Sequence, residues 1–132
     1  MTFLLDTNTL SAHMKHAGLL NHRFIQYYGR LAIATVALGE IYAWAFMNPN
    51  TEKRLETIDD ILSDLSILDY DADCAQQFGR LRGDLKSRGI TVPTADLMIA
   101  SVALVHDLTL VTHNTADFQQ IPHLRLDDWL AS

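Results

Sequence analysis

Four acidic residues lie at the edges of apolar segments that are far apart in the chain. Asp6 follows the run FLL, Glu40 lies in ATVALGEIYAW, Asp96 in VPTADLMIASVAL, and Asp117 in LVTHNTADF. Like charges brought together repel each other unless a cation joins them. Carboxylate oxygens are the ligands that the hard cations Mg²⁺ and Mn²⁺ prefer. If folding brings these acids together, the chemistry they suit is metal-assisted cleavage of a phosphodiester.

Each acid taken alone also has an ordinary structural explanation. Asp6 could cap the helix that follows it, and Asp96 suits the positive N-terminal end of a helix. Asp117 could be a turn residue before an aromatic side chain. Glu40 is harder to explain in this way, because its helical face is apolar and no lysine or arginine lies within a turn or two. The metal-site hypothesis therefore depends on the four acids acting together.

Further polar residues flank these acids and leave two interpretations open. Asn8, Thr112 and Asn114 could hold a water molecule or a phosphate, or they could simply form turns. A basic cluster is either an ordinary solvated face or a track for nucleic-acid phosphates; it consists of Arg80, Arg82, Lys86 and Arg88. The histidines show no metal-ligand spacing, and we interpret His113 as a loop residue.

Composition favours one packed domain over residues 1–132. The chain has 132 residues, of which 48% are hydrophobic, and its formal charge is −6. The acidic balance argues against non-specific coating of nucleic acid, although the candidate site alone would contribute four of these charges. No apolar run approaches the roughly 20 residues of a membrane span, and no secretory leader is evident, so we expect a cytoplasmic protein. The single cysteine, Cys74, excludes an intrachain disulfide, and its helical spacing predicts a buried thiol.

Strand-like and helix-like segments alternate along the whole chain. Short apolar runs predict strands at residues 2–6, 31–34, 66–70 and 108–112, and one within 124–130. Apolar periodicity and capping residues predict helices at 8–16, 20–28, 35–47, 51–65, 71–89 and 94–106, with Thr35 and Thr94 as N-caps. This alternation predicts an α/β three-layer sandwich with a short, mostly parallel central sheet. Ligands of such folds bind at the carboxyl ends of the strands, where the four acids could converge.

The order of these motifs resembles that of the PIN-domain ribonucleases. The matching segments are LLDTNTLSA, the T-x-A-x-x-E helix of 35–40, DLMIASVAL at 96–104 and LVTHNTADF at 110–118. The closing RLDDW of 125–129 is also typical of the VapC-type toxins among them. The resemblance spans nearly the whole chain. Two departures concern the surroundings of the acids: Ala43-Trp44 follow Glu40 where a glycine is common, and Thr94-Ala95 precede Asp96 where an asparagine is common.

The resemblance implies a Mg²⁺- or Mn²⁺-dependent endoribonuclease that cleaves structured RNA of the tRNA or rRNA class and is inhibited by a cognate antitoxin. Asp6 and Asp96 would then be the principal metal ligands, and Glu40 and Asp117 would complete the site. Asn8, Thr112 and Asn114 would support it. Members of this family are commonly homodimers that assemble further with the antitoxin, so we expect both kinds of complex.

An acidic pocket that holds a cation could also receive a basic side chain from such a partner, because arginine binds two carboxylate oxygens at once. Tyr42, Trp44 and Phe46, which follow Glu40, could line a groove for the partner's helix. Ordinary core packing is the competing explanation for at least two of the three.

Two other functions remain open from the sequence. The first is an inactive PIN-like module that only binds RNA or protein. The second is a phosphatase of the haloacid dehalogenase type, because LLDTNT resembles the D-x-D-x-T motif at a strand end. That chemistry needs an acid where this chain has Asn8, and no catalytic lysine context follows.

Overall fold

Five short strands, all paired in parallel, form the centre of the protein in the order β3-β2-β1-β4-β5. The structure is a computed structural model and describes residues 2–131. The strands are β1 (Phe3–Leu5), β2 (Leu31–Ala34), β3 (Ser66–Leu68), β4 (Thr109–Val111) and β5 (Leu126–Asp127).

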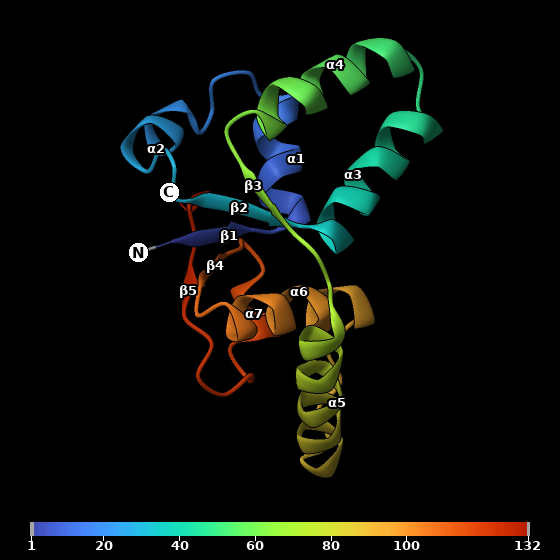
Figure 1. Cartoon of the computed structure of the whole chain (residues 1–132), viewed down its shortest axis with the longest axis vertical. Helices are drawn as coiled ribbons and strands as arrows, with labels where there is room; N and C mark the ends of the chain where they lie inside the picture. The colour runs from blue at the N-terminus through green and yellow to red at the C-terminus, as the bar shows by residue number, and fades with distance from the viewer. Residues whose placement is uncertain (1, 132) are drawn as a thin grey trace.

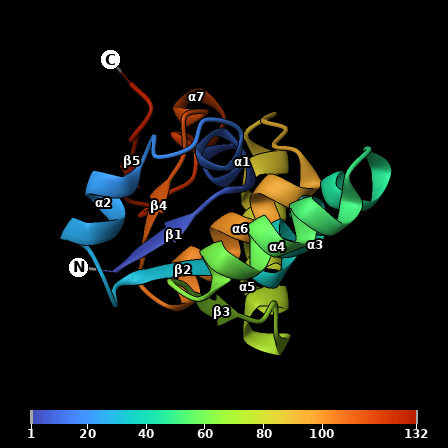
Figure 2. The same ribbon diagram turned by 90° about the horizontal axis from the view of Figure 1, so that it is seen from above.

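Seven helices in the described residues surround this sheet. They are α1 (Thr7–Lys15), α2 (Asn21–Gln26), α3 (Thr35–Met47), α4 (Thr51–Leu62), α5 (Ala72–Ser87), α6 (Thr94–Val105) and α7 (Thr115–Phe118). Helices α1, α2 and α4 lie on one side of the sheet, and α5 and α6 lie on the other (Figures 1 and 2). Helix α3 contacts both α1 and α6, and α7 packs beside β5. The predicted α/β three-layer sandwich is therefore confirmed, with a sheet that is entirely parallel.

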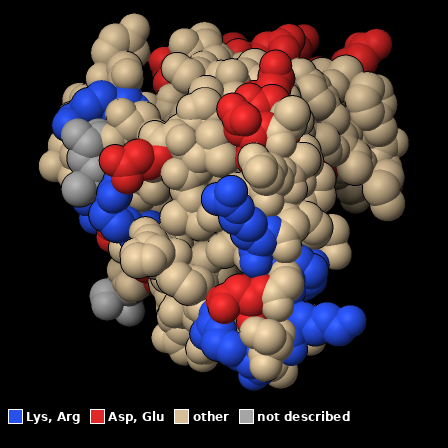
Figure 3. Space-filling model, turned by 60° about the horizontal axis from the view of Figure 1, so that its bottom comes forward, with Lys and Arg blue, Asp and Glu red and all other residues tan. Residues whose placement is uncertain are grey.

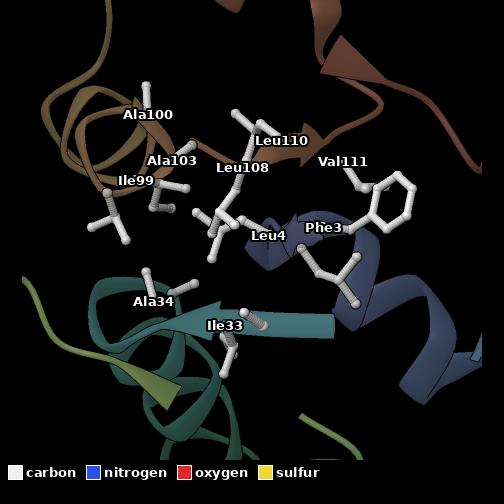
Figure 4. Packing of buried hydrophobic residues seen from close by; sticks show 14 of the residues in the cluster. Phe3, Leu4, Ile33, Ala34, Ile99, Ala100, Ala103, Leu108, Leu110 and Val111 are labelled. Carbon is white, nitrogen blue, oxygen red and sulfur yellow. The ribbon is translucent and has the colours of Figure 1, made fainter. Parts of the chain in front are cut away.

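The core lies between the sheet and α6 and continues on the opposite face. Side chains of β1 and β4, among them Leu4 and Leu110, converge with Ile99 and Ala103 of α6, whereas Ile33 of β2 points to the opposite face (Figure 4). The three central strands are apolar at nearly every position because helices cover both of their faces, as is usual in parallel sheets. Near the C-terminus Trp129 is buried, and its ring centroid lies 5.2 Å from that of Phe3.

Local chemistry explains where several helices begin and end. Asp6 caps α1 by accepting a 2.8 Å hydrogen bond from the Thr9 N–H, and Asp71 caps α5 in the same way at Cys74. These bonds satisfy backbone donors that the first turn of a helix leaves unpaired. Gly89 follows α5 with a φ of +70°, a conformation that glycine adopts without steric strain.

Two predicted helix caps are wrong. Helices α3 and α6 do begin at Thr35 and Thr94, but neither hydroxyl caps its own helix. The Thr35 hydroxyl accepts the backbone N–H of Tyr70, which ties the segment after β3 to the start of α3. The Thr94 hydroxyl instead accepts a 3.3 Å bond from the Arg82 side chain. In both cases the threonine hydroxyl accepts a hydrogen bond from a residue outside its helix, instead of from the backbone N–H groups of the first helical turn.

Most predicted elements are present, but several are shorter than expected. The helix predicted at 20–28 ends at Gln26, the one at 51–65 ends at Leu62, and the strand at 66–70 ends at Leu68. Helix α7 was not predicted, because four residues are too few to show a helical period. Cys74 is a buried free thiol, as expected. No helix within residues 2–131 is long and apolar enough to span a membrane.

Candidate metal centre and active site

The register of the central strands sets the edge at which the candidate site lies. Leu5 of β1 pairs with Val111 of β4, and the next N–H, that of Asp6, donates a 3.1 Å bond to the Val111 carbonyl. On the other side of β4, the Thr112 N–H donates a 2.9 Å bond to the Asp127 carbonyl. Asp6 and Thr112 therefore follow neighbouring strands at the same carboxyl-terminal edge, where parallel α/β sheets bind ligands.

Asp6 is held tightly at this edge. Its side chain is 5% exposed, and its Oδ1 atom accepts the N–H of Thr9 in the first turn of α1. The capping role considered from the sequence is thus confirmed. A carboxylate has two oxygens and about four lone-pair positions, so capping leaves it able to accept a further partner.

Glu40 reaches the same region from α3 but is exposed, as is Ala43 on the same apolar face of the helix. The apolar character of this face therefore does not bury the carboxylate. The Thr7 hydroxyl nevertheless orients it by donating a 2.6 Å hydrogen bond to Oε1. Sequence reasoning missed Thr7, although its position between Asp6 and Asn8 in the DTN motif could have suggested a role.

Asp96 lies in the first turn of α6 and feels the charge of the other three acids. Burial raises the pKa of its carboxyl above the usual value. Three negative charges raise this pKa further, in falling order those of Asp117, Asp6 and Glu40. The fold therefore brings Asp6, Glu40 and Asp117 close enough to Asp96 for their charges to act on its carboxyl.

Asp117 reaches the cluster from α7 through a chain of short polar contacts. Its Oδ2 atom accepts a 2.5 Å hydrogen bond from the Asn114 amide, and the Asn114 N–H donates in turn to the Thr112 hydroxyl. Thr112 is completely buried. The predicted supporting residues Thr112 and Asn114 thus position Asp117 at the end of β4, whereas Asn8 is exposed on α1.

The donor set fits a hard divalent cation, because all four groups are carboxylates and their mutual repulsion favours a shared positive charge. As the side chains stand, no three acidic, imidazole or thiol groups within residues 2–131 are arranged so that they could hold a metal ion. Asp6, Glu40 and Asp117 each accept a hydrogen bond from a neighbour. Metal binding would therefore require side-chain rotation within the cluster.

The predicted basic cluster divides into two kinds of residue. Two guanidinium groups make contacts within the protein: Arg82 donates to the Val92 carbonyl and to Thr94, and Arg88 pairs with Asp84 at 2.7 Å. Arg80 and Lys86 are exposed on the same helix, α5. Figure 3, which views the molecule with this helix brought forward, shows Lys and Arg side chains gathered together with acidic groups among them.

One pair of residues near the site escaped the sequence interpretation. His113, which was interpreted as a loop residue, lies between Thr112 and Asn114 and contacts Asp128 at 2.9 Å. The sequence offered only a weak signal for this pair, because 15 residues separate the two side chains.

Comparisons with known proteins agree with this architecture. The chain matches the PIN domain family over residues 3–124. It is 33% identical to Ribonuclease VapC2 of Rickettsia felis over 132 residues, with 98% of each chain covered. It is also 33% identical over 130 residues to the tRNA(fMet)-specific endonuclease VapC of Salmonella typhimurium, again with 98% of each covered.

Solved structures give the same result. A chain of the DNA-bound VapBC crystal structure from Salmonella typhimurium aligns with a TM-score of 0.93 at 33% identity, with 98% of both chains covered. VapBC2 from Rickettsia felis, bound to a promoter DNA fragment, aligns at a TM-score of 0.92 and 31% identity, with coverage of 98% of this chain and 99% of that one.

The fold and the acidic edge define a nuclease of the PIN type, a class that generally uses a divalent metal ion. Within that class, the chain belongs to the VapC ribonuclease family. This assignment removes the haloacid dehalogenase alternative, in agreement with the amide at Asn8 where that chemistry requires an acid.

Proposed function

We propose that residues 1–132 act as one nuclease domain that cleaves structured RNA of the tRNA or rRNA class and serves as the toxin of a toxin–antitoxin pair. The observation that carries this proposal is that Asp6 and the Asn114–Asp117 pair follow neighbouring strands at one edge of the sheet, with Glu40 bonded beside them through Thr7. The charges of these acids also act on Asp96. Two relatives named tRNA(fMet)-specific endonucleases support tRNA as the first substrate to test.

The proposed cation is Mg²⁺ or Mn²⁺, because the donor set consists of oxygen atoms. Asp6 and Asp96 would be its principal ligands, with Glu40 and Asp117 completing the site. Such a cation supplies Lewis-acid activation of water and stabilises the negative charge that develops during cleavage of the phosphodiester.

The chain's own residues prepare this site in three ways. Asp6 is fixed against the Thr9 N–H, Thr7 orients Glu40, and Asn114 orients Asp117. Pre-organised groups of this kind reduce the reorganisation that must take place during a reaction. Arg80 and Lys86 could attract RNA phosphates, whereas Arg82 and Arg88 mainly stabilise the fold.

The proposed partner is the cognate antitoxin. The proposed assemblies are a homodimer and a toxin–antitoxin hetero-oligomer, and the proposed compartment is the cytoplasm. The structures of related VapBC complexes support the antitoxin. Light scattering of the purified protein, alone and with the product of the adjacent gene, measures both assemblies.

The function is tested with purified protein and an initiator tRNA transcript, with Mg²⁺, with Mn²⁺ and with EDTA. We expect cleavage with a metal ion and none with EDTA. Asp96→Asn should abolish cleavage, whereas Asp73→Asn, which removes an exposed acid on α5, should retain it. RNA binding without cleavage under every metal condition would instead favour the inactive PIN-like module. Cleavage by the Asp96→Asn protein at the wild-type rate would contradict the proposed metal site.

A further inference from the structure

His113 and Asp128 form a hydrogen-bonded pair beside the acidic edge. The Nδ1 atom of His113 lies 2.9 Å from Oδ2 and 3.2 Å from Oδ1 of Asp128. The histidine side chain is 62% exposed and the aspartate side chain 20% exposed. The Nδ1 edge of the imidazole ring is therefore held by a partly buried carboxylate, while most of the ring remains in contact with solvent.

Asp128 is itself rigidly placed. Its Oδ1 atom accepts the N–H groups of Leu130 and Ala131 at 2.9 and 3.1 Å. Burial acts to raise the pKa of Asp128, but the hydrogen bonds from Leu130 and His113 outweigh it, so this pKa is lower than usual. An ionised carboxylate needs a donor, which assigns the proton to Nδ1 of His113. The other ring nitrogen, Nε2, has no part in this bond and is available to a ligand.

The backbone around His113 is equally constrained. Thr112 donates its N–H to the Asp127 carbonyl, and its hydroxyl accepts the N–H of Asn114. Asn114 also holds Asp117, a member of the acidic cluster. His113 therefore lies between two residues that build the candidate site, with its ring oriented by Asp128, which directly follows β5.

We propose that His113 binds a phosphate of the RNA next to the scissile one through Nε2, and that Asp128 is the positioning residue that orients the ring. This inference rests on the ribonuclease function proposed above. The four acids repel a polyanion, so the substrate needs cationic or donor groups beside them. When the ring carries both protons, Nδ1–H donates to Asp128 and Nε2–H can donate to a phosphate oxygen, a charge-assisted bond of the stronger kind.

The competing explanation is a purely structural pair that fastens the C-terminal turn to the end of β4. His113→Asn separates the two explanations, because an asparagine amide can still donate to Asp128 but places nothing at the position of Nε2. The matched control is His22→Asn, which makes the same change at an exposed histidine on α2.

The probe is a fluorescently labelled initiator tRNA transcript. Its dissociation constant is measured in EDTA over a series of salt concentrations, and KM and kcat are measured with Mg²⁺. For His113→Asn we expect a dissociation constant and KM about tenfold higher, a kcat within about twofold of wild type, and an unchanged melting temperature. The slope of log K against log salt should fall by roughly 0.7 to 0.9, the value of one lost phosphate contact.

Asp128→Asn should weaken binding by a smaller factor, because His113 remains but its ring is less well oriented. Wild-type KM and salt slope in His113→Asn would overturn the inference and leave the pair with a structural role only. A loss of affinity that accompanies a lower melting temperature, with the salt slope unchanged, would also overturn it. If the wild-type protein neither binds nor cleaves tRNA or ribosomal RNA, the proposed function itself fails and the inference falls with it.

Discussion

The hydroxyl of Thr7 donates a 2.6 Å hydrogen bond to Oε1 of Glu40, although 33 residues separate the two in sequence. Thr7 is the first residue of α1 and directly follows Asp6, whereas Glu40 lies within α3. The bond thus links two helices at the acidic edge. It also orients a carboxylate that the fold leaves exposed to solvent.

Loss of this bond should impair cleavage without unfolding the protein. In Thr7→Val the side chain keeps its shape but cannot donate to Glu40. If the bond contributes about 1.4 kcal/mol to orienting the carboxylate, kcat should fall about tenfold. Thr7→Ser keeps the hydroxyl and should remain close to wild type. Initial rates on a tRNA transcript measure the effect, and a Thr7→Val protein with full activity would show that the bond has no part in catalysis.

The raised pKa of Asp96 predicts a pH-dependent stability in metal-free buffer. The folded protein binds this proton more tightly than the unfolded chain does. Stability should therefore fall as the pH rises from the ordinary aspartate value through the raised pKa of Asp96. Asp96→Asn removes both the proton and the charge, so the fall in stability that Asp96 causes with rising pH should disappear. The variant should therefore be more stable than wild type at neutral pH.

Urea unfolding in EDTA, from about pH 4 to about pH 8, compares the two proteins over the window in which a raised carboxyl pKa acts. Asp59→Asn, at an exposed position of α4, is the control and should follow the wild-type curve. Identical pH profiles for wild type and Asp96→Asn would mean that neither burial nor the neighbouring acids raise the pKa of Asp96 in solution.

Binding of a cation to the folded state should raise the melting temperature. At about 100 times the dissociation constant, the free energy of unfolding should increase by roughly 2.7 kcal/mol. The Asp6→Asn/Asp96→Asn variant should lose most of this shift, and the asparagine at residue 6 should preserve the helix cap. Glu56→Gln/Asp59→Asn removes two exposed charges of α4 and should keep the shift. Differential scanning calorimetry with Mg²⁺ and Mn²⁺ provides the measurement; a wild-type melting temperature that neither ion changes would count against the site.

The sheet was predictable because its strands are short apolar runs bounded by polar residues. The strand expected at 31–34 is β2 itself, and the one expected at 108–112 contains β4. Helix ends were less predictable, because Thr35 and Thr94 bind Tyr70 and Arg82, which no local pattern reveals. Apolar periodicity locates an element, whereas the bonds at its ends depend on residues that only the fold brings together.

The candidate site was predictable because its acids are among the polar residues that bound the apolar runs. Asp6 and Asp117 follow strands, and parallel strands place their carboxyl ends at a common edge. Asn114, which bonds Asp117 from three residues away, could also be predicted, but the pairs Thr7–Glu40 and His113–Asp128 could not. Thr7 lies 33 residues from Glu40, and His113 lies 15 residues from Asp128. These distances in sequence carry no periodic signal, so only the tertiary structure identifies the pairs.

The division within the basic cluster predicts different phenotypes for its members. Arg80→Gln/Lys86→Gln should keep the wild-type melting temperature but weaken RNA binding. If each residue contacts one phosphate, the slope of log K against log salt should fall by about 1.4 on single-stranded RNA. Lys53→Gln on α4, which lies on the other side of the molecule from α5 (Figure 1), is the control for lost positive charge. An unchanged salt slope in the double variant would remove the two residues from the RNA-binding surface.

Arg82→Gln should show the opposite behaviour. Its guanidinium group donates to the Val92 carbonyl and to the Thr94 hydroxyl. Thr94 lies two residues before Asp96. Loss of these bonds should lower the free energy of unfolding by about 1 to 2 kcal/mol and should reduce kcat through the position of Asp96. Urea unfolding and single-turnover rates measure the two effects, and a variant with wild-type stability would show that these bonds contribute little.

Inhibition by the antitoxin should depend on both a basic side chain and an apolar surface. Burial and three acidic neighbours raise the pKa of Asp96, so the cluster is a suitable receptor for an arginine or lysine of the partner. Tyr42 and Trp44 are half-buried, in line with core packing, whereas Phe46 is 64% exposed and can contact a partner helix. Expression of the protein alone should arrest growth, and co-expression with the product of the adjacent gene should restore it.

Phe46→Ser should retain wild-type cleavage of tRNA but require about tenfold more antitoxin for half inhibition, since burial of a large apolar side chain contributes roughly 1.5–3 kcal/mol. Ile67→Ser, at an exposed apolar residue of β3, is the matched control. Excess Mg²⁺ should relieve inhibition only in part, because the apolar contact persists after a cation displaces the basic side chain. Wild-type inhibition of Phe46→Ser would place the antitoxin on another surface. The toxin function would be contradicted if expression of the protein did not slow growth and the product of the adjacent gene did not co-purify with it. A nuclease with another cellular role would then remain possible.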